Sequence, residues 1–532
     1  MRFAARVRNS RNSPAFALPR GNRGSILLAV GASAFVIIAI SVVLLSLTTS
    51  AMRANNRQQV RSSALQIAES AAERGVLWLR DQALPPASDR NISSLIGAAP
   101  QGSWTVLINC DADNPNQFLK KFEILATGTL SGQTRTVQLI VKQSTFGKYA
   151  YFTDRETSSG GGAIWWNSKD RIDGPVHSNN TGASNFNIDY SGWSSNNPRR
   201  PIFYDQVTAS GSTINYSPSR PRNETDFQKV FLNGSKGYLL GIQKINLPPS
   251  TSAQKEAAWG SGSGFPSTNG VYLRATKDAY GVDKGGIYIQ GDATITMSVD
   301  ASGNQIMTVK QGASTTTIKY DKTTGTTSAT GPVGPGSPTS ASSYSNGVIY
   351  CSGHITALSG TIADNKVSGG AITRRSSWTI ATDTNNLKDI TIAGNLVYQT
   401  RPNKALPAND PVNLAAGTLG LVGQEIRIAD DGTSSHNHPN REIDAVLLAG
   451  SSSVDGSISV NNYSVGSVGT LKVIGGLIQS TRGAVGTISG GVINHGYQKD
   501  YNYDPRLAIA PPPFYPTTGQ YDRLSWMVPP GS

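Results

Sequence analysis

The pattern of hydrophobic positions begins with one uninterrupted apolar run, from Ser25 to Leu47. The run holds no charged residue and no proline. As a helix it would extend roughly 35 Å, which is enough to cross the hydrocarbon core of a bilayer. The apolar part of a secretory signal is usually about 7 to 15 residues long, so a discarded signal peptide is the weaker interpretation. The pattern predicts a transmembrane helix over 25–47.

Helical periodicity continues beyond the apolar run. Residues 53–82 contain no proline and a single glycine, and apolar residues recur at spacings of three, four and seven. One stripe of this segment consists of Val60, Ala64, Ile67 and Ala71. Such a stripe is typical of an amphipathic helix, and the proline pair at 85–86 ends it. The sequence therefore predicts one helix over 25–84, transmembrane in its first part and amphipathic in its second.

Residues 85–145 have the alternating pattern of strands. Three strands are predicted near 103–110, 119–128 and 133–143, with turns at "NPNQ" and "SGQT". An antiparallel meander of this kind needs a cover for its apolar face. The amphipathic half of the helix is the expected cover.

From about Phe146 the predicted strands are short and are separated by turns rich in Gly, Ser and Asn. The segment "GGIYIQGDAT" (285–294) aligns without a gap with "GVIYCSGHIT" (347–356), and 390–399 and 471–480 are looser copies. Stacked units of this kind bury a core that none can bury alone. We expect a β-solenoid-like domain over 146–500 with a hairpin insertion at 294–345, and a Greek-key sandwich is the alternative.

The C-terminal residues 501–532 are rich in proline. "YDPRLAIAPPPFYP" predicts a strap that caps the last rung of the stack, because exposed strand edges invite aggregation. A contact between Asp504 and Arg506 would fix its start. The whole pattern predicts a mainly β protein with one long N-terminal helix.

Composition agrees with a turn-rich β protein, since 56 of the 532 residues are Gly and only 15% are charged. The formal charge of +13 is uneven, and six arginines precede the apolar run without any acid: Arg2, Arg6, Arg8, Arg11, Arg20 and Arg23. This places the N-terminus in the cytoplasm and the bulk outside, on the far side of the inner membrane. No later segment clusters basic residues, so a nucleic-acid partner is not expected.

The two cysteines, Cys110 and Cys351, fit neither a zinc spacing nor a CxxC motif. Outside the cytoplasm they would be able to form one disulfide across a long loop. Two separate buried thiols are the alternative.

Two segments resemble a known family. "RGSILLAV" resembles a prepilin-peptidase site, which implies a basic leader over 1–24, cleavage after Gly24 and Ser25 as the first mature residue. "ALQIAESAAERGVLWLR" resembles the helix of PilX-type minor pilins and pseudopilins. The resemblance covers about 20–145 and implies an assembly helix that packs with other pilin subunits. A plain single-pass anchor is the alternative.

The resemblance departs from major pilins at Ala29, where those proteins carry Glu at the fifth mature position. In the family that Glu pairs with the N-terminal amine of a neighbour. Its absence predicts a low-copy component. Farther along, "FGKYAYFTD", "DRIDGPVHSNN" and "YNYDPRLAIAPPPFYP" resemble large uncharacterised bacterial pilin-like proteins, which implies a structural role in the envelope.

Two groups of residues carry candidate chemistry. Asp173, His177 and Asn179 lie within one short segment, as a catalytic His beside an acid or as a tight Gly-Pro turn with hydrogen bonds to a loop. We expect the turn. His436 and His438 lie near Asp430, Asp431 and Glu442 in a polar loop, where metal binding is the weaker interpretation.

Carbohydrate chemistry is the other class to weigh. A solenoid that cleaves glycans needs clustered carboxylates on successive rungs, and the repeats carry Tyr, Thr, Gln and Gly instead. Trp165, Trp166 and Trp193 read as loop aromatics able to stack on sugars or to fill the end of the stack. We expect no enzyme and no cofactor, and a minor pilin-like component of a type IV pilus or related filament. The alternative is a membrane-anchored protein that binds or cleaves carbohydrate.

Overall fold

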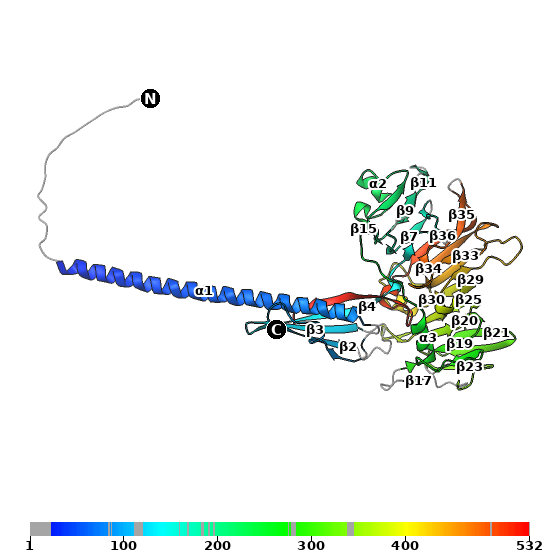
Figure 1. Cartoon of the computed structure of the whole chain (residues 1–532), viewed down its shortest axis with the longest axis horizontal. Helices are drawn as coiled ribbons and strands as arrows, with labels where there is room; N and C mark the ends of the chain where they lie inside the picture. The colour runs from blue at the N-terminus through cyan, green and yellow to red at the C-terminus, as the bar shows by residue number, and fades with distance from the viewer. Residues whose placement is uncertain are drawn as a thin grey trace, which may run out of the picture.

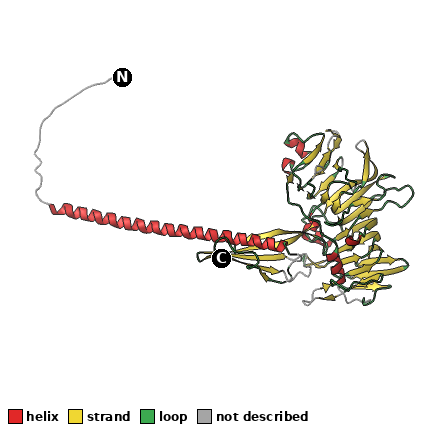
Figure 2. Cartoon of the chain, viewed as in Figure 1, coloured by secondary structure: helices red, strands yellow, loops and turns green. Residues whose placement is uncertain are grey.

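The computed structural model of this chain describes residues 23–82, 86, 88–110, 121–158, 160–167, 170–181, 186–189, 192–194, 197–274, 276–277, 283–337, 345–489 and 492–530. One long helix, α1 (Arg23–Arg80), projects from an assembly made almost wholly of strands (Figures 1 and 2). The predicted class, mainly β with one long N-terminal helix, is confirmed. Most of the predicted leader lies outside the described residues.

The helix α1 has 58 residues and divides into a free arm and a packed part. Side chains from Ile26 to Gln59 are exposed, and the helix is long and apolar enough to cross a membrane. From Ala64 onward one face is buried against a sheet, through Ala64, Ala68, Ala71, Ala72 and Leu79. Small residues predominate on this face because helix and strand backbones nearly touch there.

The sheet beneath α1 is antiparallel and has the order β1-β2-β3-β4-β37. Its strands are β1 (Arg90–Asn91), β2 (Ser103–Cys110), β3 (Lys121–Leu130), β4 (Gln133–Thr145) and β37 (Thr517–Met527). The sequence predicts β2, β3 and β4, and it assigns the region of β37 to a strap. The end of the chain instead returns to pair with β4. We call this sheet and the packed part of α1 the helix–sheet module.

The rest of the chain, from Tyr151 to Tyr503, forms a stack of parallel strands. One ladder runs through β19 (Ile287–Gln290), β24 (Val348–Cys351), β28 (Trp378–Thr382), β30 (Leu419–Gly423), β32 (Arg441–Ala449), β34 (Val468–Thr481), β5 (Tyr151–Arg155), β8 (Val176–Ser178), β13 (Val207–Ala209) and β15 (Tyr238–Leu240). Each neighbouring pair in it is parallel.

Further parallel ladders continue the stack. One comprises β20 (Ala293–Val299), β25 (Ile355–Ile362), β29 (Ile390–Tyr398), β31 (Ile426–Ile428) and β33 (Ile458–Val460). The long strands β32 and β34 lead into β36 (Val492–Tyr503), β7 (Arg171–Asp173) and β12 (Ile202–Phe203). Successive parallel ladders are expected of stacked coils, whereas Greek-key neighbours are antiparallel.

The internal repeat found in the sequence corresponds to adjacent rungs. Tyr288 on β19 pairs directly with Tyr350 on β24, and their ring centroids are 5.4 Å apart. The alignment of 285–294 with 347–356 therefore matches the structural register of the paired residues up to Ala293. At the last position of the repeat a bulge between Ala293 and Thr294 shifts the register by one, so Thr294 pairs with Ala357.

The rungs do not follow one another in chain order. The first strand, β5, lies between β34 and β8, so the chain enters the stack in its middle. Residues 151–240 build one end, residues 241–270 cross over, and later strands build the other end and return to β5. The order of the strands in the stack therefore differs from their order in the chain.

The predicted hairpin insertion also differs from the structure. The strands β20, β21 (Gln305–Gln311), β22 (Ser314–Tyr320) and β23 (Thr327–Thr330) form an antiparallel meander, as predicted. Because β20 also pairs with β25, the meander continues the stack at its end and does not project from it.

Smaller elements decorate the stack. The strands are β16 (Gly270–Leu273) and β35 (Gly486–Ser489), the set β6 (Trp165–Trp166), β9 (Phe186–Asp189) and β14 (Ile214–Ser217), and the hairpins β10 (Gly192–Ser194) with β11 (Asn197–Arg199), β17 (Thr276–Lys277) with β18 (Asp283–Lys284), and β26 (Lys366–Ser368) with β27 (Ala371–Arg374). The short helices are η1 (Phe146–Lys148), α2 (Glu224–Gln228), η2 (Gly234–Lys236), α3 (Ser252–Trp259), η3 (Thr384–Asn386), α4 (Pro411–Ala415) and α5 (Arg506–Ile509).

Among the described residues three apolar cores result, and one of them lies between α1 and its own sheet. Another fills the interior of the stack. The third lies on the outer side of the first ladder and includes Tyr288, Tyr350 and Leu448, covered by residues of η1, α3 and the strap, among them Phe146, Trp259 and Tyr515. This cover ties the helix–sheet module to the stack, and a cavity lies at that junction.

Candidate functional site: a cavity at the junction

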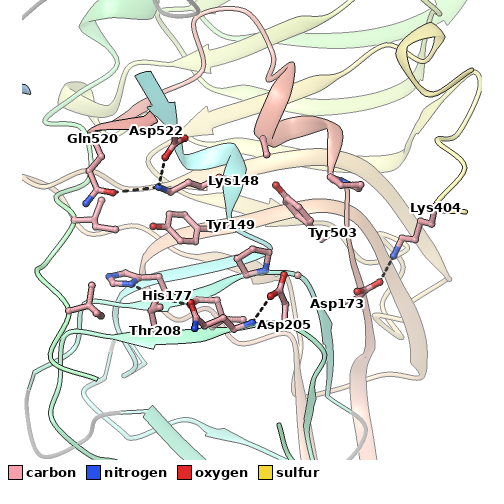
Figure 3. A pocket seen from close by; sticks show the side chains of 18 residues that line it. Lys148, Tyr149, Asp173, His177, Asp205, Thr208, Lys404, Tyr503, Gln520 and Asp522 are labelled. Atoms are coloured by element: carbon pink, nitrogen blue, oxygen red, sulfur yellow. Dashed lines mark hydrogen bonds and ion pairs between the residues drawn. The ribbon is translucent and has the colours of Figure 1, made fainter. Parts of the chain in front are cut away.

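A cavity of about 810 Å³ lies where the helix–sheet module meets the stack (Figure 3). Its walls come from η1, β7, β8, β13, β36, α5 and β37, and from the crossover at residues 242–245. These segments are remote in the sequence. Only the entry of the stack in mid-chain and the return of β37 bring them together.

Lys148, at the end of η1, links the cavity to β37. Its ammonium lies 3.6 Å from the Asp522 carboxylate and 3.4 Å from the Gln520 side-chain oxygen. It also lies 5.3 Å from the ring centroid of Tyr149. Lys148 thus places one cation beside an aromatic ring and within reach of a bound polar group.

His177 on β8 is buried in the wall beneath Tyr149. Its Nε2 lies 2.9 Å from the Asn179 side-chain oxygen, and its Nδ1 lies 2.8 Å from the Thr208 hydroxyl. The Asn179 amide is oriented by Ile245, whose N–H donates to its oxygen and whose carbonyl accepts from its nitrogen. An oriented amide oxygen requires Nε2 to carry the proton. The Thr208 hydroxyl beside Nδ1 also lies 3.0 Å from the Val176 carbonyl, to which it donates.

Burial lowers the pKa of His177 to about 4; the hydrogen bond that its ring donates to Asn179 opposes this and the nearby Lys148 charge adds to it. The ring stacks on Phe152, with centroids 5.3 Å apart. His177 is therefore neutral at pH 7 and held between two polar partners and an aromatic ring.

Asp173 does not contact His177 through any hydrogen bond that the described residues show. Its carboxylate lies 2.6 Å from the Lys404 ammonium, which also reaches the Asn502 oxygen at 3.2 Å. The interpretation of "IDGPVHSNN" as a turn with hydrogen bonds to a loop agrees with these contacts, whereas a His–acid pair does not form.

Gly174 in this turn lets β36 come close. Its φ is +142°, and an added Cβ would lie 2.5 Å from the Cβ of Tyr503. The Tyr503 hydroxyl donates to the Gly147 carbonyl at 3.1 Å. A glycine here thus allows a tyrosine ring to form the wall facing Tyr149.

The cavity as a whole mixes charges and rings. Lys148 and Lys404 bring positive charge, and Asp173, Asp205 and Asp522 bring negative charge. The Asp205 side chain accepts from the backbone N–H of Gln206 at 2.7 Å and remains exposed. Such walls suit a neutral polar ligand with an apolar face.

Residues 117–212 match the family described as "Domain of unknown function (DUF4900)". The matched stretch runs from β3 through β13 and so spans the junction. It contains Lys148, Tyr149, Asp173, His177 and Asp205, which form one side of the cavity.

No curated protein matches the chain. Among solved structures, the competence-associated pilin ComZ from Thermus thermophilus is similar at 15% identity with a TM-score of 0.27. The alignment covers 88% of this chain and 96% of that one. At this score the two chains do not superpose closely.

The predicted contact at the start of the strap is confirmed. Arg506 meets the Asp504 carboxylate through Nη2 at 2.7 Å and Nε at 3.0 Å, and both side chains are buried. Arg506 also donates to the carbonyls of Asn413 and Ala416. This anchors the strap next to the cavity wall.

The histidine pair of the other loop does not converge. His436 Nδ1 lies 2.8 Å from the Asp430 carboxylate, whereas both ring nitrogens of His438 face backbone carbonyls, those of Ser467 and Asn461. Across the described residues, no group of three or more His, Cys, Asp or Glu is placed to hold a metal ion. Asp431 accepts from Thr433 and Asn437, and Glu442 pairs with Arg401.

The interpretation of the tryptophans as loop aromatics is wrong for Trp166. It is fully buried, with its ring 4.7 Å from Tyr151 and 5.4 Å from Phe203. The Arg482 guanidinium lies 4.0 Å from its ring centroid and is paired with the buried Glu156 at 3.0 Å. Trp165 is half-buried, and the side chain of Trp193 lies outside the described residues.

The predicted assembly residues of α1 divide into two groups. Ala64 and Ala71 are fully buried against the chain's own sheet, so they are not available to a neighbouring helix. Val60 and Ile67 remain partly exposed, and Ala29 is exposed on the free arm. Gly24 and Ser25 lie in the first turn of α1, and cleavage between them stays a prediction.

No disulfide joins the two cysteines, and of the two alternatives the structure agrees with separate thiols. Cys351 is buried within the stack and its thiol donates to the Gly291 carbonyl, whereas Cys110 lies on β2 of the helix–sheet module. Burial raises the pKa of Cys351 to about 12, so it remains a thiol. The two cysteines belong to different modules, in keeping with the predicted segments 85–145 and 146–500.

Sequence reasoning missed Lys148, Tyr149, Tyr503 and Asp522 as parts of one site. Each is a common residue type in a segment without a motif. The only available signal was the group of aromatic-rich segments "FGKYAYFTD" and "YNYDPR", which the sequence did not connect.

Proposed function

We propose that this chain is a minor-pilin-like structural component of a bacterial type IV pilus or a related envelope filament. It acts by assembly and display, without catalysis. The observation that supports this proposal most directly is the continuity of α1. Its exposed apolar arm runs without a break into the part of the helix that packs in the helix–sheet module.

The arm is suited to lipid or to other apolar helices. Its few polar side chains bond to backbone carbonyls three or four residues earlier, as for Ser33 to Ala29, Ser41 to Ile37 and Thr49 to Leu45. Such bonds hide hydroxyls from an apolar medium. A flexible anchor would need only a span, whereas this arm is stiffly joined to the module that it carries.

Display of the stack agrees with the geometry of Figure 1, where the stack lies at the end of α1 opposite the arm. Assembly would pack the arms together and leave the stack on the outside. Ala29 in place of a Glu favours a low-copy position, because the ion pair of a bulk subunit would be missing.

The N-terminus of protein purified from its native membrane tests the proposal. We expect a chain that begins at Ser25, and Gly24→Val should leave the leader attached, since a branched side chain blocks close approach of a protease. Gly21→Val is the matched control and should be processed normally. Mature protein that retains Met1 would overturn the proposal.

A second function is favoured by the cavity: recognition of a neutral saccharide by the displayed domain. Two tyrosine rings, Tyr149 and Tyr503, lie among hydrogen-bonding groups, the combination that sugars require. The full chain in detergent should bind members of a glycan panel. Lys148→Met and Asp205→Ala should each weaken that binding by roughly tenfold, and the exposed Lys310→Met should not. Equal binding by all variants would exclude the cavity.

A further inference from the structure

A small internal cavity lies in the stack where its first strands meet its last ones. Its volume is about 10 Å³, and the residues that line it include Tyr151, Trp166, Arg482, Lys499 and Tyr501. The first two belong to β5 and β6, the third directly follows β34, and the last two lie on β36. The cavity is therefore enclosed by segments that lie far apart in the chain.

Two positive charges border this cavity. The Arg482 side chain is 4% exposed, and its guanidinium lies 4.0 Å from the ring centroid of Trp166. The Lys499 ammonium lies 5.7 Å from the same centroid. Their ion-pair partners, Glu156 at 3.0 Å and Asp170 at 3.1 Å, are not among the described residues that line the cavity. The cations therefore border the cavity and their carboxylates do not.

The other polar groups of the lining are mainly hydrogen-bond donors. Arg482 Nη2 and Trp166 Nε1 are buried and have no acceptor within the described residues. The Tyr151 hydroxyl accepts from Gln479 Nε2 at 3.0 Å, which leaves its own hydrogen to donate. The Gln479 side-chain oxygen is already engaged, because two backbone N–H groups donate to it at 3.0 Å. The lining thus offers more donors than acceptors.

This excess of buried donors indicates the kind of ligand that fits the cavity. Buried donors in folded proteins almost always have an acceptor, in the protein itself or in a bound water or ion. A water molecule would accept two hydrogen bonds but would also have to donate two, and the lining leaves few acceptors for it. An anion only accepts, and hydrogen bonds between an anion and cationic donors are the stronger kind.

The size of the cavity restricts the anion to a single atom. A volume of about 10 Å³ holds about one water-sized particle. Sulfate, phosphate and carboxylates are too large, whereas chloride is a common anion of one atom. Chloride is slightly larger than water, and the flexible side chain of Lys499, which is 20% exposed, is able to move aside.

We infer that this cavity is a chloride site, in which Arg482, Lys499 and the hydroxyl of Tyr501 donate to the ion. The site has a structural role that is separate from assembly of the arm. Arg482 pairs with a residue 326 positions earlier in the chain, and Lys499 with one 329 positions earlier. A chloride ion held by both cations would stabilise the contact between the first strands of the stack and the last.

Thermal unfolding of the full chain in detergent tests this site. Chloride is titrated at constant ionic strength, with gluconate as the replacing anion. The Tm should rise with chloride, because a ligand that binds only the folded state stabilises it. Bromide should also raise the Tm, and acetate, which is too large for the cavity, should not. Equal Tm values in chloride and gluconate, or an equal effect of acetate, would overturn the inference.

Tyr501→Phe removes one donor from the cavity and keeps the aromatic ring. The chloride concentration required for a given rise in Tm should increase by about tenfold, because a hydrogen bond to a charged group is lost. Tyr497→Phe is the matched control. It lies on the same strand, but its hydroxyl donates to the Pro439 carbonyl at 2.9 Å, so the chloride dependence should be that of the unaltered chain.

The double variant Lys499→Met/Asp170→Asn removes one cation without leaving an unpaired buried charge. Its Tm should no longer change with chloride. If this variant does not fold, Tyr501→Phe decides the question alone. A chloride dependence that neither set of substitutions alters would overturn the assignment of the ion to this cavity.

Discussion

At the scale of residues, close contact between backbones determines how α1 packs on its sheet. Gly128 on β3 lies directly against α1, and an added Cβ would lie 2.4 Å from the Ala64 carbonyl oxygen and 2.6 Å from the Ala68 nitrogen. Neither atom is free to move aside, because both belong to the helix backbone. The alanines of α1 and this glycine therefore form one fitted contact.

Gly128→Val should separate α1 from its sheet. We expect the helix–sheet module to lose about 3 kcal/mol or more of its free energy of unfolding, since overpacking against a backbone cannot relax through rotamers. Thermal unfolding of the purified chain measures the loss. Gly160→Ala is the control, because the nearest atom to its new Cβ, the Ser158 hydroxyl, is 3.9 Å away; an equal loss in both variants would contradict the account.

His177 gives the stability of the stack a dependence on pH. Its pKa is about 4 in the folded chain against 6.5 for an exposed histidine, and burial is the main cause. Between these values the unfolded chain binds a proton that the folded chain does not. Stability should therefore be highest above pH 6.5 and fall by about 3 kcal/mol as the pH reaches 4.

The comparison with His177→Gln isolates this contribution from that of the carboxylates. The variant has no titrating group at this position, so its unfolding free energy should fall less between pH 6.5 and pH 4. Chemical denaturation across that range is the measurement. Identical slopes for the two proteins would show that His177 is not responsible.

At the scale of elements, local signals account for some of the architecture and long-range pairing for the rest. The end of α1 and the strands β2 to β4 follow from periodicity and turn residues close to them in the chain. β37 has no such signal: its partner is β4, and residues joined across the two, Gln143 and Thr517, are 374 positions apart. A short Pro-rich region before it therefore suggested a strap.

The same distinction holds for the site. The turn at Gly174 and the hydrogen bond between His177 and Asn179 follow from local sequence. Tyr503 and Asp522 join them only through pairing that no local pattern encodes. Trp166 illustrates the converse, since its flanking Gly and Asn residues suggest a loop whereas its ring is covered by residues from distant strands.

Removal of β37 should uncover the edge of β4. A chain that stops after Pro516 would leave the backbone groups of β4 unpaired and exposed, which favours association with other chains. We expect amide exchange in β4 to accelerate by roughly tenfold or more and soluble protein to decrease. A chain that stops after Val528 keeps β37 and should behave as the full chain; equal protection in both would contradict the pairing.

At the scale of the whole molecule, the order of the rungs means that the first strands of the stack complete their pairing only after much later strands have been synthesised. The first strand, β5, needs β34 as one neighbour, and β34 is synthesised more than 300 residues later, as the Tyr151–Gln479 separation of 328 shows. Pairing of such remote strands is intrinsically slow. Repeats in the sequence reveal that the units stack, but not the order in which the rungs follow one another.

Synthesis should therefore leave the early strands incomplete until late. A ribosome-bound chain that ends at residue 467 should be cleaved by protease within 151–240, whereas one that ends at residue 532 should resist. Both chains carry the same linker, and limited proteolysis is the measurement. Resistance in the shorter chain would show that β5 does not depend on β34.

The return of β37 to β4 has a further consequence. Thr145 and Thr517 are paired neighbours, so the chain leaves the helix–sheet module and comes back at almost the same point. Everything between them is an insert held by two adjacent stems. Such an insert is exchangeable. Any domain whose two ends lie as close together as paired residues can be joined to β4 and β37 at these positions, and the helix–sheet module that carries it need not change.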